Sequence, residues 1–341
     1  MHFVRRLCTH VNPSKYVEKV RLLEYWRVQD DVLRKEFFRA KMLLILDKSP
    51  LLVKGTNGFQ LSRHTLPELE KSLGDYGVFF DIHNSCLLDA EVENNFWVPL
   101  FGISVKTETP PEGSPVDKKQ VIRGLGDSLG GRFMDIRSAM FMVSSEEDRL
   151  LLARFYSLSK WAHVFCRCPR CAAALVTKIS KASARCRSCN IAFYPNISPA
   201  IISLIKNHEN SHLLLVRQRN YTPGMYTCVA GFANVGEHLH ETVKREVAEE
   251  VGIEIEHVVT EDYTQPWPLP DGSLMIPNVS VADMNQPIDK CPAELENARW
   301  FSREEVQAAF DRTLADPLYK YIPPSGVLAH RLIRKWLNNQ L

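Results

Sequence analysis

The sequence has little net charge, no long apolar run and no internal repeat. A formal net charge of +2 over 341 residues gives no electrostatic indication of polyanion binding. The longest apolar runs, such as Met42–Leu46 and Ala200–Ile205, are far too short to span a bilayer, so no membrane partner is expected. With 45% hydrophobic and 24% charged residues, the composition is that of a globular protein. The length allows two domains and a small third module.

The beginning of the sequence also lacks acidic residues. No Asp or Glu occurs from Met1 to Val17, whereas Arg5, Arg6 and Lys15 are basic. This pattern is typical of a mitochondrial transit peptide and predicts a mitochondrial protein. An ordinary unstructured start of a cytoplasmic protein explains the same residues, and both interpretations stay open.

Nine cysteines are more than a hydrophobic core needs, and five of them lie within residues 166–189. Two CxxC knuckles, Cys168–Cys171 and Cys186–Cys189, can each give two thiolates to one tetrahedral Zn²⁺. No apolar signal-peptide core is visible, so a secreted disulfide framework is not indicated. The spacing predicts a structural zinc ribbon over residues 161–197, with Cys166 left as a plain thiol. Redox-active or merely buried cysteines are the alternative.

The regions on either side of the ribbon mix helical and strand patterns. Residues 1–100 carry no chemical motif, and residues 1–160 are predicted to form an N-terminal α+β domain. In residues 198–341, short apolar runs are separated by turn residues, and helices are indicated at about 238–251 and 325–339. We therefore predict the α+β class, with an αβα sandwich in the C-terminal domain.

Two further helices have a recognisable start. Ser144 and Glu147 have the spacing of a capping box, in front of a helix expected at about 145–161. Ser302 and Glu305 have the same spacing. In a capping box the two side chains each accept a backbone N–H that the first helical turn leaves unpaired. We expect a helix to begin at each pair.

Three carboxylates recur on one face of the helix expected before Gly252. Glu246, Glu249 and Glu250 fall at positions i, i+3 and i+4, which share a helix face. Three like charges are unfavourable there unless a cation lies among them, and hard oxygen ligands suit Mg²⁺ or Mn²⁺. Arg245 has Glu249 four residues after it and Glu241 four residues before it, and can pair with either to hold the array. A solvated acidic helix face is the alternative.

The preceding loop extends this pattern. Gly231 and Gly236 suit a tight loop, and Glu237 follows directly. Residues 231–253 match the Nudix box, Gly-x5-Glu-x7-Arg-Glu-aliphatic-x-Glu-Glu-x-Gly-aliphatic, at every position. The chain thus resembles the Nudix hydrolases, which cleave diphosphate bonds. Cations on the carboxylates would neutralise the phosphate oxygens and orient a water, whose proton Glu249 or Glu250 could accept.

The zinc ribbon in front of the box narrows the resemblance to the NADH pyrophosphatase subfamily, over roughly residues 137–341. The segments similar to this subfamily are Trp161–Cys166, Phe193–Pro195, Gln265–Pro268, Ser273–Met275 and Pro323–Ile333. The segment from Thr264 to Gly272 departs from the subfamily pattern. Thr264 and Leu269 replace a serine and an aromatic residue, and Asp271–Gly272 lengthen the loop. Substrate preference is therefore less firmly predicted than hydrolysis.

The resemblance also implies roles for single residues. The metal ligands would be Glu246, Glu250, Glu294 and the carbonyl oxygen of Ala230. Phe232 and Tyr194 would sandwich the adenine ring, with Tyr194 reaching across a homodimer interface, since aromatic faces stack on adenine. Further contacts to the dinucleotide would come from Gln265, Trp267, Ser273, Met275 and Ala329. A core aromatic is the alternative for Tyr194, and simple loop packing is the alternative for Trp267.

The predicted reaction is hydrolysis of the diphosphate of NADH, and also of NAD⁺ or NADPH, to nicotinamide mononucleotide and AMP. Removal of an NAD cap from RNA breaks the same bond, but it needs a basic path that the sequence does not indicate. Another nucleoside diphosphate derivative is a further alternative. A non-catalytic nucleotide sensor is less well supported, because such proteins usually lose box carboxylates and this sequence keeps them all.

Overall fold

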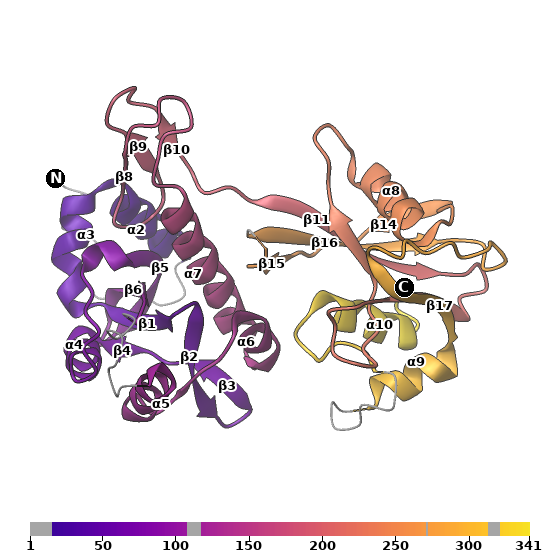
Figure 1. Cartoon of the computed structure of the whole chain (residues 1–341), viewed down its shortest axis with the longest axis horizontal. Coiled ribbons are helices and arrows are strands. Elements are labelled where there is room, and N and C mark those ends of the chain that lie inside the picture. Colours follow the sequence, from indigo (N-terminus) through magenta and orange to yellow (C-terminus); the bar gives the residue numbers. More distant parts are fainter. Residues whose placement is uncertain (1–15, 108–116, 271, 313–320) are drawn as a thin grey trace. The chain divides into compact units, whose positions relative to one another are not determined.

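A computed structural model describes residues 16–107, 117–270, 272–312 and 321–341. The chain divides into two compact units, the first ending at Asn196 and the second running from Ile197 to Leu341 (Figure 1). Residues 1–15 of the acid-free segment, and Asp271 of the lengthened loop, lie outside the described residues.

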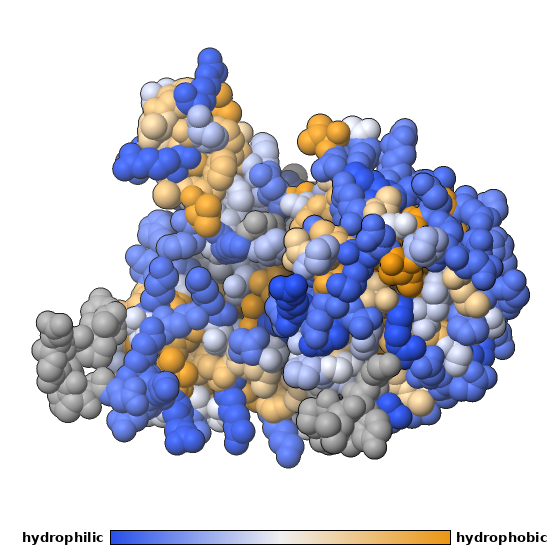
Figure 2. Space-filling model, turned by 45° about the vertical axis from the view of Figure 1, so that its right-hand side comes forward, coloured by the Kyte–Doolittle hydropathy of each residue, from blue (hydrophilic) through white to orange (hydrophobic). Residues whose placement is uncertain are grey.

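Hydrophilic residues cover most of the face shown in Figure 2, and hydrophobic ones form small groups. In the described ranges, no helix is long and apolar enough to cross a membrane.

The first unit is built on a seven-stranded mixed sheet in the order β3-β2-β1-β6-β5, with β4 paired to β1 and β7 to β2. The strands are β1 (Lys41–Leu46), β2 (Ser49–Gly55), β3 (Gly58–Leu61), β4 (His64–Thr65), β5 (Ser85–Glu93), β6 (Phe96–Val105) and β7 (Arg132–Phe133). β1 and β6 run parallel, and Leu46 pairs with Val105, so both strands end at the same edge. Met42, Leu44 and Leu46 alternate along β1 and share one core cluster, as period-two geometry requires.

The helices of this unit surround that sheet (Figure 1). They are α2 (Tyr16–Val28), α3 (Asp30–Glu36), α4 (Leu66–Gly74), α5 (Lys118–Ser128), α6 (Ile136–Met142) and α7 (Glu146–Val164), with short 3₁₀ turns η1 (Phe37–Arg39) and η2 (Ile82–Asn84). The predicted capping box at Ser144 and Glu147 is wrong by one residue. Ser145 is the N-cap of α7, and its hydroxyl accepts the backbone N–H of Asp148 at 3.0 Å.

The ribbon follows α7 and is a small antiparallel sheet in the order β10-β9-β8. Its strands are β8 (Leu175–Thr177), β9 (Ala184–Cys186) and β10 (Ala192–Phe193). Trp161 stacks on Phe165 with ring centroids 5.6 Å apart, and Phe165 meets Phe193 edge-on at 5.3 Å. These three aromatic rings join the end of α7 to both ends of the ribbon.

The second unit is the predicted αβα sandwich. Its sheet has the order β14-β16-β11-β12-β17, with β13 on β11 and β15 on β16. The strands are β11 (Ser198–Lys206), β12 (His212–Gln218), β13 (Val229–Phe232), β14 (His257–Thr260), β15 (Gln265–Trp267), β16 (Ser273–Val281) and β17 (Leu295–Ser302). The helices are α8 (Leu239–Val251), α9 (Arg303–Phe310) and α10 (Leu328–Leu337). α8 covers one face of the sheet, and α9 and α10 cover the other (Figure 1).

Strand β11 serves both layers of this sandwich. Ile201 and Ile205 lie in the cluster that contains the apolar side of α8, whereas Ile202 and Leu204 lie in the cluster that contains α10. Successive side chains of a strand point to opposite faces, so a mainly apolar run fits a strand covered on both sides. The one polar member, Ser203, is buried and shares a hydrogen bond with the hydroxyl of Ser280 at 2.7 Å. The apolar run Ala200–Ile205 therefore forms the buried centre of the second unit.

Candidate active site

The carboxylate side of α8 faces the protein rather than solvent. Glu246 is 9% exposed and Glu250 is 3% exposed, although both are acidic. Burial, together with the nearby Glu246, Glu294 and Glu249 carboxylates, raises the pKa of Glu250 to about 8. Burial also raises the pKa of Glu246. The alternative of a solvated acidic face therefore does not describe these two residues, and of the three carboxylates Glu249 alone lies exposed.

The late carboxylate, Glu294, reaches the same place from a different element. It lies in the turn before β17, and the turn is joined to the end of α8 by two backbone hydrogen bonds. The N–H of Asp289 donates to the carbonyl of Val251 at 3.0 Å, and the N–H of Cys291 donates to that of Glu250 at 2.8 Å. These bonds bring Glu294 close enough to raise the pKa of Glu250.

Gly231 leaves room for the carboxylate of Glu246. A Cβ built on Gly231 would lie 1.9 Å from Cδ of Glu246, which is far inside van der Waals contact. The backbone of Gly231 is not in the left-handed region, whereas Gly236 has φ +88°. The expectation that both glycines serve a tight turn thus holds for Gly236, and Gly231 is needed for space instead. Ala230, the predicted carbonyl ligand, directly precedes it on β13.

Arg245 links the loop and the carboxylates. Its Nε donates to Oε1 of Glu237 at 2.6 Å, and its Nη1 donates to Glu246 and to Glu249, each at 2.8 Å. Its Nη2 also donates to the carbonyl of Phe232 at 2.7 Å. The predicted pair with Glu249 is present, but the one with Glu241 is wrong, because Glu241 instead accepts the backbone N–H of His238 at the helix start.

Glu237 is the residue whose role the sequence reasoning missed. It lies in the loop, eight positions from Arg245, where helical spacing makes no prediction. The hydrogen bond from Arg245, with that from the backbone N–H of Asn234, lowers the pKa of Glu237 to about 2. Glu237 therefore stays ionised and orients the guanidinium that holds Glu246 and Glu249.

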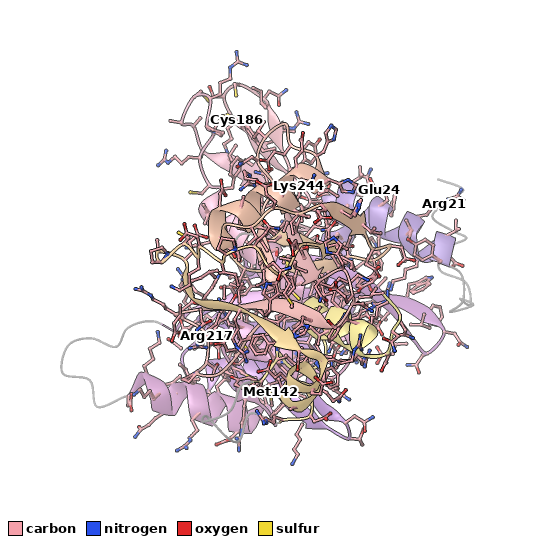
Figure 3. All side chains as sticks on the ribbon, turned by 90° about the vertical axis from the view of Figure 1, so that its right-hand side faces the viewer. Arg21, Glu24, Met142, Cys186, Arg217 and Lys244 are labelled. Atoms are coloured by element: carbon pink, nitrogen blue, oxygen red, sulfur yellow. The ribbon has the colours of Figure 1, made fainter. Side chains whose placement is uncertain are left out.

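The four predicted zinc cysteines come together in the ribbon, where Figure 3 labels Cys186. Among the described residues, only Cys168, Cys171, Cys186 and Cys189 form a metal-type group with ligand atoms within 4.8 Å of one another. The backbone N–H groups of Cys189 and Ser188 donate to Sγ of Cys186, each at 3.4 Å, and lower its thiol pKa to about 6. Cys189 lies beside the other thiols, and its pKa is raised to about 11. Four cysteine ligand atoms grouped in this way suit a structural zinc ion, whose positive charge would favour the thiolate form of each.

The residues predicted to contact the dinucleotide differ in their exposure to solvent. Tyr194 is 66% exposed and Phe232 is 43% exposed, so both aromatic faces are open to solvent. Trp267 lies on β15, which pairs with β16. Met275 packs partly buried against the same core cluster that contains the buried Ala329.

Two of these residues use their polar groups inside the fold. Nε2 of Gln265 donates to the carbonyl of Gly326 at 2.8 Å, and its Oε1 accepts the N–H of Leu328 at 3.2 Å. The hydroxyl of Ser273 donates to the carbonyl of Leu269 at 3.1 Å. Gln265 thus fixes the loop that leads into α10, and Ser273 fixes the loop between β15 and β16. Direct contact with a substrate stays a prediction for them.

The donor set of α8 fits a hard cation. Two buried carboxylates with raised pKa values lie beside a third from the β17 turn, and one guanidinium is shared with Glu237. A divalent ion would relieve the repulsion that raises the pKa of Glu250, and oxygen ligands of this kind suit Mg²⁺ or Mn²⁺. These features define an αβα sandwich that presents carboxylates for a divalent cation.

Comparison with known proteins gives the family. Residues 197–322 match the NUDIX domain family model. The chain is 48% identical over 339 residues to NAD-capped RNA hydrolase ndx-9 of Caenorhabditis elegans, covering 96% of this chain and 91% of that protein. It is 32% identical over 345 residues to NAD(P)H pyrophosphatase NUDT13, mitochondrial, of Homo sapiens, covering 96% and 92%. NAD-capped RNA hydrolase NUDT12 of Homo sapiens is 35% identical over 205 residues, or 56% of this chain and 42% of that protein.

The chain belongs to the Nudix hydrolases, in the group that contains NADH pyrophosphatases and NAD-capped RNA hydrolases. Membership implies a divalent metal, and the cysteine cluster suggests a structural zinc site.

Proposed function

We propose that this protein hydrolyses the diphosphate of a nicotinamide adenine dinucleotide, such as NADH, NAD⁺ or NADPH, to nicotinamide mononucleotide and AMP or its 2′-phosphate form. The observation that carries this proposal is the buried group of Glu246 and Glu250 beside Glu294, in which the pKa of Glu250 is raised to about 8 by burial and like charge. Such an arrangement costs stability and is useful where a cation must meet a diphosphate.

The carboxylates divide into two roles in this proposal. Glu246, Glu250, Glu294 and the carbonyl of Ala230 would hold Mg²⁺ or Mn²⁺, and such an ion would supply the positive charge that polarises the diphosphate and a water. Glu249 is exposed and keeps one oxygen on Arg245, so it is the better placed group to accept a proton from water. Arg245 keeps Glu246 and Glu249 in place through the ionised Glu237.

Phe232 and Tyr194 are proposed to hold the adenine ring between them, in a homodimer in which each Tyr194 serves the partner's site. Their exposure of 43% and 66% supports this role, because a packing residue would be covered. Phe232→Ala and Tyr194→Ala should each raise KM for NADH about tenfold while kcat changes less, since stacking on a base contributes about 1–3 kcal/mol. Sedimentation should show a dimer, and a monomer with full activity would contradict the shared site.

The second candidate substrate is an NAD-capped RNA, and the 48% identity to a protein named as an NAD-capped RNA hydrolase favours it. The bond cleaved and the residues proposed to cleave it are the same. A mitochondrial location is proposed on the acid-free N-terminal segment and on the relative named as mitochondrial.

One panel of substrates tests these proposals. Purified protein with Mg²⁺ or Mn²⁺ is incubated with NADH, NAD⁺, NADPH, ADP-ribose and NAD-capped RNA, and kcat/KM is compared. The proposed function expects a nicotinamide dinucleotide or the capped RNA to be cleaved best, with nicotinamide mononucleotide as a product. A larger kcat/KM for ADP-ribose would contradict it, and the ratio of capped RNA to free NAD⁺ decides between the two candidates.

A further inference from the structure

The first unit contains a cavity of about 680 Å³ that the carboxylate helix does not touch. It lies where the parallel strands β1 and β6 end together, which is the edge at which parallel strands commonly offer ligand sites. Lys48 follows the end of β1 and Lys106 follows the end of β6. Lys160 comes from α7, and Lys181 comes from the ribbon.

The charge of this cavity has one sign. Four lysines and two histidines line it, and its lining includes no Asp or Glu. Nζ of Lys106 lies 3.4 Å from Nε2 of His163, so two basic groups meet with no carboxylate between them in the lining. Cationic side chains gathered in a concave site raise the local concentration of anions.

Nearby carboxylates are engaged elsewhere. Oδ2 of Asp47 accepts from Nζ of Lys118 at 3.0 Å and from the hydroxyl of Thr107 at 2.5 Å. The carboxylate of Asp81 accepts the backbone N–H of His83 at 2.7 Å. Asp81 and Asp30 act electrostatically on Lys181, but neither lines the cavity, so its four lysines leave the lining an excess of positive charge.

The remaining lining groups suit the rest of a nucleotide. Phe79 is 81% exposed at the cavity, and Tyr156 is half-buried there, so aromatic surface is available for a flat ring. Ser85, Ser104 and Ser159 supply hydroxyls. Lys181 is buried and its Nζ donates to the carbonyl of His83 at 2.8 Å, which fixes one cationic group. A volume of about 680 Å³ is in the range of small-ligand sites.

We propose that this cavity binds the phosphate of a nucleotide, with its base against Phe79, at a second site separate from the Nudix carboxylates. The nucleotide can come from two sources, a free mononucleotide or a nucleotide unit of an RNA strand. The site binds and does not hydrolyse, because its lining offers no carboxylate to hold a cation. The proposal does not depend on which dinucleotide the carboxylate helix cleaves.

The test compares two pairs of charge reversals in the full-length protein. Lys48→Glu with Lys106→Glu changes the cavity, and both residues are exposed, so folding should be kept. Lys54→Glu with Lys71→Glu makes the same change of charge at exposed lysines outside the cavity. Calorimetry then measures binding of AMP, inorganic phosphate and a short 5′-phosphorylated oligoribonucleotide, with uncharged adenosine as a further comparison.

The cavity variant should bind one equivalent of AMP fewer than the surface variant, or bind that equivalent about tenfold or more weakly. Both variants should hydrolyse NADH like the parent protein. Equal stoichiometry and affinity in the two variants would overturn the proposal, and so would equal binding of adenosine and AMP. Oligoribonucleotide bound more than about tenfold tighter than AMP would assign the site to an RNA strand, and equal binding would assign it to free nucleotide.

Discussion

The protein carries two candidate ion sites that differ in how they relate to the fold around them. In the ribbon, short strands surround four thiols whose ligand atoms already lie within 4.8 Å, and few apolar side chains are buried. In the second unit, the carboxylates of α8 lie beside two large apolar clusters that pack both faces of a sheet. A zinc ion in the ribbon would therefore hold its fold together, whereas the fold of the second unit holds its carboxylates together against their repulsion.

The largest effect should come from removing a ligand of the ribbon. Cys186→Ser should abolish stoichiometric zinc binding and unfold the ribbon locally, because zinc coordination contributes about 10 kcal/mol in small zinc domains. Zinc content and limited proteolysis around residues 166–193 would measure this. Cys166→Ser is the matched control, since Cys166 is exposed and outside the cluster. A Cys186 variant that retains one zinc ion and resists protease would contradict the claim that zinc coordination by the four cysteines stabilises the ribbon.

The second-largest effect should be a loss of activity without a loss of stability. Glu250→Gln removes a charge from the carboxylate group and should lower kcat/KM about a thousandfold, with folding kept. Glu256→Gln, which changes an exposed glutamate paired with His208, should leave kcat/KM unchanged. Turnover and thermal denaturation, measured for both variants, separate a loss of activity from a loss of stability. If the Glu250 variant kept full turnover, the carboxylates of α8 would not be the site of hydrolysis.

A smaller loss is expected from filling the space at Gly231. The Cβ of Gly231→Ala would meet the carboxylate of Glu246, so this side chain must move and kcat/KM should fall about thirtyfold or more. Gly74→Ala has no atom within 4 Å of its new Cβ and serves as the control. The backbone of Gly231 tolerates alanine, so thermal stability should change little. Unchanged kinetics for the Gly231 variant would show that hydrolysis does not require the Glu246 carboxylate to lie against residue 231.

The smallest effect concerns pH. Without divalent metal, folded Glu250 keeps its proton up to about pH 8, whereas an ordinary glutamate releases it near 4.5. The folded state thus binds the extra proton between these values, so the free energy of unfolding should fall as pH rises from about 4.5 to 8. The melting temperature should drop by about 5 °C over this window and recover with Mg²⁺. Glu250→Gln should flatten this dependence, and a slope that survives in that variant would assign it to other groups.

Local patterns predicted much of the second unit. The helix expected at 238–251 is α8 at Leu239–Val251, and it ends at Gly252 with φ +74°. Ser302 caps α9 together with Glu305, as its spacing predicted. At α7 two serines stand side by side, and spacing alone could not show that Ser145 rather than Ser144 accepts the first-turn N–H.

Contacts between distant segments could not be read in the same way. The parallel pairing of β1 with β6 joins residues about 60 positions apart, and an apolar run does not specify its partner strand. The basic cavity was missed because its lysines stand at positions 48, 106, 160 and 181, which form no cluster in the sequence. Glu237 was missed as the partner of Arg245 because a loop, not a helix, sets their separation.

The two bonds from the β17 turn to the end of α8 use main-chain atoms alone. The place of Glu294 is therefore encoded by the number of residues between Asp289 and the strand, and hardly by which residues they are. Related chains should tolerate many exchanges at Lys290, Pro292 and Ala293. Position 291 should accept any residue except proline, which has no N–H to donate to the carbonyl of Glu250. An insertion or deletion between Asp289 and Glu294 would shift the Glu294 carboxylate relative to α8. Related chains should therefore keep the length of this segment even where its residues vary.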